Sequence, residues 1–259
     1  MDITILWVPL LLTFLAGLST GFGSLIALFI GRKFKKSYLS FFLGFSAGVM
    51  VYVSFAELLP VAVREIGFIR ANVAFFCGRI LIGLIDFLVP HEYIEERLKV
   101  KSSADKKLMA AGIFTAVGIA IHNLPEGLAV FVGSVKTIAL GIPLAFAIAV
   151  HNIPEGIAVS MPIYYATKSK SKAFLYSLAS GIVEPIGALI GFLVFLPFMT
   201  PGRLELMLAF VAGIMVFISF DELLPLSLKP DETGVDHVHI AVMGVFLGML
   251  FMTLSLSLF

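Results

Sequence analysis

The chain has 259 residues, of which 59% are hydrophobic and 14% are charged, and its formal net charge is +1. A soluble domain carries about 25% charged residues, so this composition indicates a membrane protein. The small net charge excludes nucleic-acid binding through a bulk basic surface. The single cysteine excludes a disulfide framework and a cysteine-rich zinc site.

Eight apolar segments are each long enough to cross a bilayer as a helix, which needs about 20 residues. Short polar loops separate them, and only helices satisfy every backbone group within such a segment. The sequence therefore predicts one polytopic, all-α membrane domain over residues 1–259. The predicted spans cover about residues 4–30, 39–60, 69–90, 110–133, 138–162, 174–197, 203–225 and 238–258.

Lysine and arginine are distributed unevenly between the loops on the two sides of the membrane. The odd-numbered loops hold 13 of these residues and the even-numbered loops hold 4. By the positive-inside rule, the odd-numbered loops are cytoplasmic and both termini face outside. The apolar run at 3–30 is too long for the core of a cleaved signal peptide, so it is interpreted as the first span.

Spans 2 and 7 share a sequence pattern. GFSAGVMVYVSFAELLP at 44–60 matches AFVAGIMVFISFDELLP at 209–225, and GSLI at 23–26 matches GALI at 187–190 more weakly. Each pair lies five spans apart, so its members cross the membrane in opposite directions. Spans 1–3 and 6–8 are therefore predicted to be inverted repeats around spans 4 and 5, which is typical of transporters. The alternative is an old duplication without transport.

Two nearly identical motifs place polar residues near the midpoints of spans 4 and 5. They are HNLPEG at 122–127 and HNIPEG at 151–156, and Glu184 lies near the midpoint of span 6. Charged groups at this depth cost several kcal/mol. No lysine or arginine lies at the same depth in spans 4–6, so a divalent cation is the simplest neutralising partner.

The spacing within the motifs fits metal binding. The histidine and glutamate of each motif are four residues apart and share one helix face. Two imidazoles and two carboxylates suit zinc and the other late divalent metals of the first row. The asparagines point about 100° away and can bind a second ion, with the motif glutamates as bridges. The predicted metal residues are His122, Asn123, Glu126, His151, Asn152, Glu155 and Glu184.

Other functions for these polar residues were weighed. A single intramembrane histidine often serves as a contact between helices, but two motif copies together with Glu184 favour a metal passage. An intramembrane zinc metalloenzyme is the alternative function. It lacks the HExxH pattern on one helix, so the chain is not expected to be an enzyme. A metal-gated receptor would need a signalling domain, and none is predicted.

With these motifs, the chain resembles the ZIP family of metal transporters over its whole length, and its ZupT-type zinc-uptake branch most closely. The resemblance implies import of Zn²⁺, and also of Fe²⁺, Mn²⁺, Co²⁺ or Cd²⁺, across the bacterial inner membrane into the cytoplasm. It implies a homodimer in which spans 1, 4, 5 and 6 move against spans 2, 3, 7 and 8. It also implies a binuclear site, with one ion on His122, Glu126, His151 and Glu155, and the other on Asn123, Glu126, Asn152, Glu155 and Glu184. The loop at 90–107 departs from many relatives because it holds only one histidine, His91.

Further candidates lie at helix ends. Glu57 ends span 2, and Asp221 and Glu222 end span 7. They are interpreted either as entrance and exit steps for a cation or as carboxylates near water, where charge costs little. His237 and His239 either take up released metal or belong to a solvated acidic loop.

Overall fold

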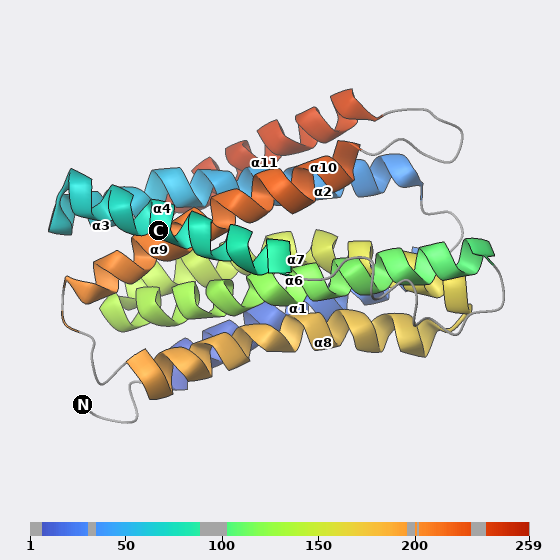
Figure 1. Cartoon of the computed structure of the whole chain (residues 1–259), viewed down its shortest axis with the longest axis horizontal. Coiled ribbons are helices and arrows are strands. Elements are labelled where there is room, and N and C mark those ends of the chain that lie inside the picture. The colour runs from blue at the N-terminus through green and yellow to red at the C-terminus, as the bar shows by residue number, and fades with distance from the viewer. Residues whose placement is uncertain are drawn as a thin grey trace.

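The computed structural model describes residues 7–30, 35–88, 103–195, 200, 202–228 and 237–258, and its secondary structure in these residues is helical (Figure 1). Eight of the helical segments are long and apolar enough to cross a membrane, which confirms the predicted all-α membrane class and the number of spans. In chain order, the α-helices are α1 (Trp7–Ile30), α2 (Lys36–Val53), α3 (Leu59–Ile66), α4 (Phe68–Leu88), α6 (Ser103–Lys136), α7 (Ile138–Thr167), α8 (Lys170–Ile190), α9 (Arg203–Ile218), α10 (Leu224–Leu228) and α11 (Val238–Leu258).

Several helices extend beyond the apolar segments that predicted them. The second span continues to Ile66, and α6 begins at Ser103. A helix does not have to stop where the hydrocarbon stops, because its outer turns can project into the headgroup region or water. Helix α7 ends where Lys168 adopts a left-handed backbone conformation with φ of 54°.

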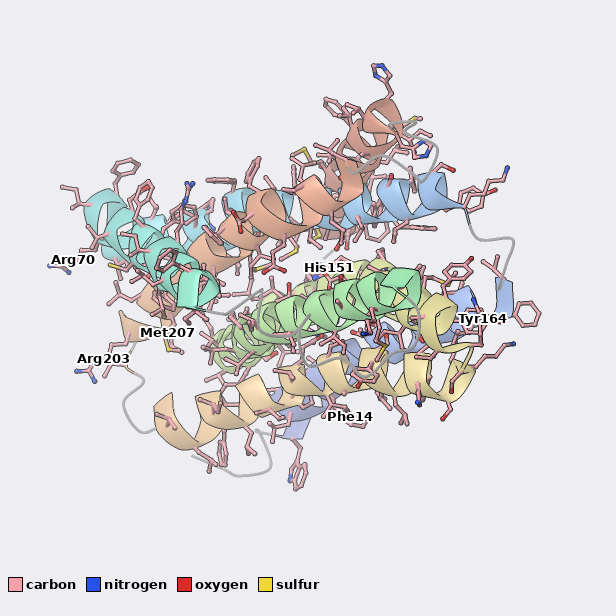
Figure 2. The ribbon with its side chains drawn as sticks, turned by 45° about the vertical axis from the view of Figure 1, so that its right-hand side comes forward. Phe14, Arg70, His151, Tyr164, Arg203 and Met207 are labelled. Carbon is pink, nitrogen blue, oxygen red and sulfur yellow. The ribbon has the colours of Figure 1, made fainter. Side chains whose placement is uncertain are left out.

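The helices form two layers, seen above and below each other in Figure 1. The first half contains α1, α6, α7 and α8, which pack mainly on one another, and the second half contains α2, α3, α4, α9, α10 and α11. Across the boundary, α2 packs on α7 and α6 packs on α9. In Figure 2, Arg70 and Arg203 lie at one end of the bundle, Tyr164 lies at the opposite end, and His151 lies between them.

Glycines bring helices of the same half into backbone contact. At twelve glycines, an added Cβ would lie closer than 3.0 Å to a carbonyl oxygen of a neighbouring helix. None of these twelve contacts, among the described residues, crosses from one half to the other. The glycines of the first half are Gly17, Gly23, Gly127, Gly156, Gly181 and Gly187, and those of the second half are Gly44, Gly48, Gly78, Gly213, Gly244 and Gly248. Each half is therefore packed more closely than the boundary between the halves.

Spans 2 and 7 both change from α- to π-helix at the same point of their shared pattern. The π segments are η3 (Ser54–Leu58) and η6 (Ser219–Leu223), and a proline follows each of them at the second residue. A proline cannot donate a backbone hydrogen bond and collides with the carbonyl four residues back in a regular helix. The wider π turn accommodates this defect, and π turns often occur at functional sites. A third π segment, η4 (Gly191–Phe195), extends α8.

Candidate metal site

The two motifs meet because α6 and α7 are joined by one residue, Thr137. Its hydroxyl accepts a hydrogen bond from the Leu140 amide and so caps α7. Helices joined by so short a turn must run antiparallel side by side, and each motif lies about four helical turns from it. Both helices continue through their motif prolines, Pro125 and Pro154.

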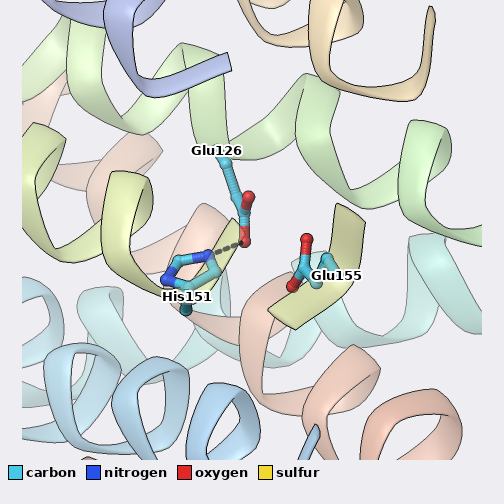
Figure 3. Close-up of side chains that lie close together, drawn as sticks. All are labelled: Glu126, His151 and Glu155. Atoms are coloured by element: carbon cyan, nitrogen blue, oxygen red, sulfur yellow. Dashed lines mark hydrogen bonds and ion pairs between the residues drawn. The ribbon is translucent and has the colours of Figure 1, made fainter. Parts of the chain in front are cut away.

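Three of the predicted ligands form a compact group. Glu126, His151 and Glu155 each place one ligand atom within 4.8 Å of the others (Figure 3). His151 Nε2 lies 3.1 Å from Glu126 Oε1. His151 and Glu155 are one turn apart on α7, whereas Glu126 reaches them from α6. Around one zinc ion, donors at about 2.0–2.2 Å lie roughly 3.3 Å apart, so small side-chain movements would let all three bind one ion.

A serine of the second half holds this group in place. Ser46, on α2, donates a hydrogen bond to Glu155 Oε1 at 3.1 Å and also lies 3.3 Å from the carbonyl oxygen of His151. Its side chain is fully buried. The sequence analysis missed this residue. The available signal was a difference between the repeats, because Ser46 corresponds to Val211 in span 7.

The motif asparagines and Glu184 lie beside this group. Asn123 Nδ2 donates to the carbonyl oxygen of Ser180 at 2.8 Å. Asn152 Nδ2 donates to the Ala16 carbonyl oxygen at 3.1 Å and to the carboxylate of Glu184. With their nitrogens engaged, both amides keep their oxygens as acceptors.

Several of these oxygens are buried and have no hydrogen-bond donor among the described residues. They are Asn123 Oδ1, Asn152 Oδ1, Glu126 Oε2 and Glu184 Oε2. A buried acceptor without a partner costs about 1–3 kcal/mol, and more if it is charged. Because all four atoms are oxygens, a cation satisfies them and an anion does not.

Buried negative charge without buried positive charge defines the electrostatics of the site. Glu126, Glu155 and Glu184 are completely buried, whereas each lysine and arginine whose exposure the structure describes is at least partly exposed. Carboxylates in a low-dielectric interior need a compensating charge. A divalent cation provides that charge and matches the nitrogen and oxygen ligands.

The other predicted residues lie outside this group. The side chain of His122 is not among those the structure describes, and most of the loop at 90–107 also lies outside the described residues. Glu57 is half-buried on η3, and Glu222 is half-buried on η6. Glu222 Oε2 packs against Gly118 of α6, two helical turns before Glu126.

Three predicted residues are at least partly exposed. Asp221 is exposed on η6, His239 is exposed in the first turn of α11, and His237, which precedes α11, is half-buried. Among the described residues, the only group of three or more potential metal ligands is that of Glu126, His151 and Glu155.

The fold and the site define a polytopic helical membrane protein with a buried cluster of metal ligands between its helices. Comparison with known proteins shows that the chain belongs to the ZIP family of zinc transporters, because residues 89–256 match the sequence profile of that family. This membership confirms the prediction of a transporter and not an enzyme, so the metalloenzyme alternative is set aside.

Full-length relatives support the same family. The chain is 48% identical to the zinc transporter ZupT of Streptococcus mutans, with 98% of each chain covered. It is 51% identical to the zinc transporter ZupT of Chlorobium limicola, covering 96% of this chain and 97% of the relative. The corresponding protein of Clostridium perfringens is 47% identical, with 96% and 95% covered.

Proposed function

We propose that this chain imports Zn²⁺ across the bacterial inner membrane into the cytoplasm, and accepts Fe²⁺, Mn²⁺, Co²⁺ and Cd²⁺ as further cargoes. The observation that carries the proposal is the buried group of Glu126, His151 and Glu155, which has no buried lysine or arginine beside it. The relatives named as zinc transporters, at about half identity over the full length, support zinc as the cargo. The other ions accept the same nitrogen and oxygen ligands.

The proposed site holds two ions. The first is bound by Glu126, His151 and Glu155, with His122 added from the first motif. The second is bound by the amide oxygens of the motif asparagines and by Glu184. Support for the second ion comes from the buried oxygens without donors, which belong to these side chains. Glu126 contributes to both ions, because one of its oxygens contacts His151 and the other has no donor.

We further propose that spans 1–3 and 6–8 are inverted repeats, with span 4 exchanging with span 5. Hydrogen bonds at the site support this exchange. Asn123 of α6 donates to the Ser180 carbonyl on α8, and Asn152 of α7 donates to the Ala16 carbonyl on α1. The two asparagines are equivalent in the motifs. The two acceptors are 164 residues apart, as are the first residues of the GSLI and GALI matches.

Helix contacts support the same exchange. The π segments η3 and η6 occupy matching positions, and the serine that begins each donates 2.7 Å to a methionine carbonyl four residues before it. Glycine contacts of α1 and α8 with the two motifs also pair up. They are Gly127 on Glu184, Gly156 on Thr20, Gly187 on Leu124 and Gly23 on Ile153.

Transport follows from relative movement of the two halves. The glycine contacts hold each half together and are absent from the described part of the boundary, so we propose that the halves move as rigid bodies. On the Lys136 side of the site, residues 125–134 of α6 are all buried, whereas several residues between 113 and 121 are half-buried. We infer that the structure is closed on the side of Lys136. The outward position of both termini, which makes this the external side, and the homodimer stay predictions.

Zinc flux into sealed proteoliposomes that contain only this protein tests the proposal. We expect uptake by the parent and loss of uptake in His151→Ala and Glu155→Gln, because each removes a ligand from the buried group. Glu65→Gln is the matched control, since Glu65 is an exposed carboxylate on α3. Uptake at the parent rate by either ligand variant would refute the assignment. Absence of uptake by the parent would refute the proposed transport itself.

A further inference from the structure

An ion pair joins the two halves at the end of the bundle where α6 ends and α9 begins. Lys136 Nζ, on the last residue of α6, lies 2.6 Å from Glu205 Oε1, in the first turn of α9. The Glu205 side chain is 5% exposed and that of Lys136 is 20% exposed. The ten residues 125–134, which lie between the site and this pair on α6, are all buried. The pair therefore closes a sealed stretch of the boundary.

The carboxylate of Glu205 depends on Lys136. Its second oxygen, Oε2, is buried and has no hydrogen-bond partner among the described residues. Loss of one member of a buried pair leaves the other as an uncompensated charge, which is strongly unfavourable. Separation of the two helix ends has the same effect unless water reaches both groups. Hence the pair favours the arrangement in which these ends are together.

We propose that Lys136 and Glu205 form a latch that stabilises the conformation closed on this side of the membrane. The inference rests on the proposed movement of the halves against each other. Lys136 moves with α6, which carries Asn123 and Glu126, whereas Glu205 moves with α9 of the other half. Opening this side for cargo must break the pair, and closing it must form the pair again. The turn at Thr137 and the start of α9 lie on the external side in the predicted orientation.

Cysteine accessibility measures this equilibrium directly. The reporter is Ala129→Cys in a Cys77→Ala background. Ala129 is 1% exposed and lies two turns before Lys136 on the same helix face. We expect slow labelling of the reporter by a membrane-impermeant maleimide added outside. Lys136→Met should raise the labelling rate about tenfold, because Glu205 loses its counter-ion in the closed state.

A charge exchange separates a latch from a local packing effect. The double variant Lys136→Glu, Glu205→Lys should return the labelling rate to within about twofold of the parent, since the attraction is restored. Glu65→Gln, at an exposed position on the same side, should leave the rate unchanged. An unchanged rate in Lys136→Met would overturn the latch, as would a raised rate that the exchange fails to lower. The elution profile of each variant in detergent verifies folding, and Glu205→Gln provides a second single variant.

Zinc uptake by the same preparations keeps the two proposals distinct. If the parent transports zinc and the Lys136→Met labelling rate equals that of the parent, the latch is wrong and the proposed function stands. If the parent does not transport zinc, the proposed function is wrong, whatever the labelling shows.

Discussion

Gly127→Ala tests whether helix spacing sets the geometry of the metal site. Gly127 follows the ligand Glu126, and its α-carbon faces the carbonyl oxygen of Glu184 on α8. An added Cβ would lie about 1.5 Å closer to that oxygen than the 3.4 Å at which ordinary contact begins. The obstacle is backbone, so α6 and α8 must separate. Metal–ligand distances tolerate only about 0.2 Å, so the separation takes Glu184 out of reach of an ion that Glu126 binds.

We expect Gly127→Ala to lower the initial rate of zinc uptake at least tenfold in proteoliposomes. Overpacking should also destabilise the protein by about 1–3 kcal/mol, measured as a lower midpoint of thermal unfolding in detergent. Gly21→Ala is the control, because its Cβ would meet only the flexible end of Leu178 at 3.0 Å. Parent-like uptake and unfolding of Gly127→Ala would refute the idea that close backbone approach fixes this site.

Further predictions concern the surroundings of the site. Ser46→Ala should raise the KM for zinc about tenfold or more, because a hydrogen bond to a charged group contributes about 1.5–3 kcal/mol; an unchanged KM would show that Ser46 does not position Glu155. Lowering the pH from 7.5 to 5.5 should slow uptake, since protonated imidazole cannot bind metal and histidine takes up a proton near pH 6.5 or below, at about its ordinary pKa; uptake rates independent of pH would contradict this. Glu57→Ala should raise KM only a few-fold, and a complete loss of uptake, like that expected for Glu155→Gln, would place Glu57 among the ligands.

Much of the fold and the central part of the site could be predicted from local pattern. Apolar runs of about twenty residues identify spans without knowledge of their packing. The four-residue spacing of His151 and Glu155 places them on one helix face, and the short connection between spans 4 and 5 brings Glu126 to the same place. These features depend on helix geometry alone, and the structure brings the three residues together as the motifs suggest.

Other features depend on how the spans pack, which no single segment encodes. Ser46 looks like any small residue of a membrane helix until α2 is placed against α7. The pair of Lys136 and Glu205 spans 69 positions of sequence, and both residues read alone as ordinary charges at helix ends. The continuation of span 2 beyond Pro60 was also missed, because proline usually ends a helix, whereas here a π turn precedes it.

The single residue between α6 and α7 has a consequence for the energetics of import. Since Thr137 joins two helices that are packed together, the ligands on both move as one unit with whatever they hold. In the proposed mechanism, an ion therefore keeps its inner coordination sphere during the crossing and never sheds ligands within the hydrocarbon. The barrier to passage is then set by the sliding of two apolar faces, and it should respond to the thickness and fluidity of the lipid more than to the strength of the metal bonds.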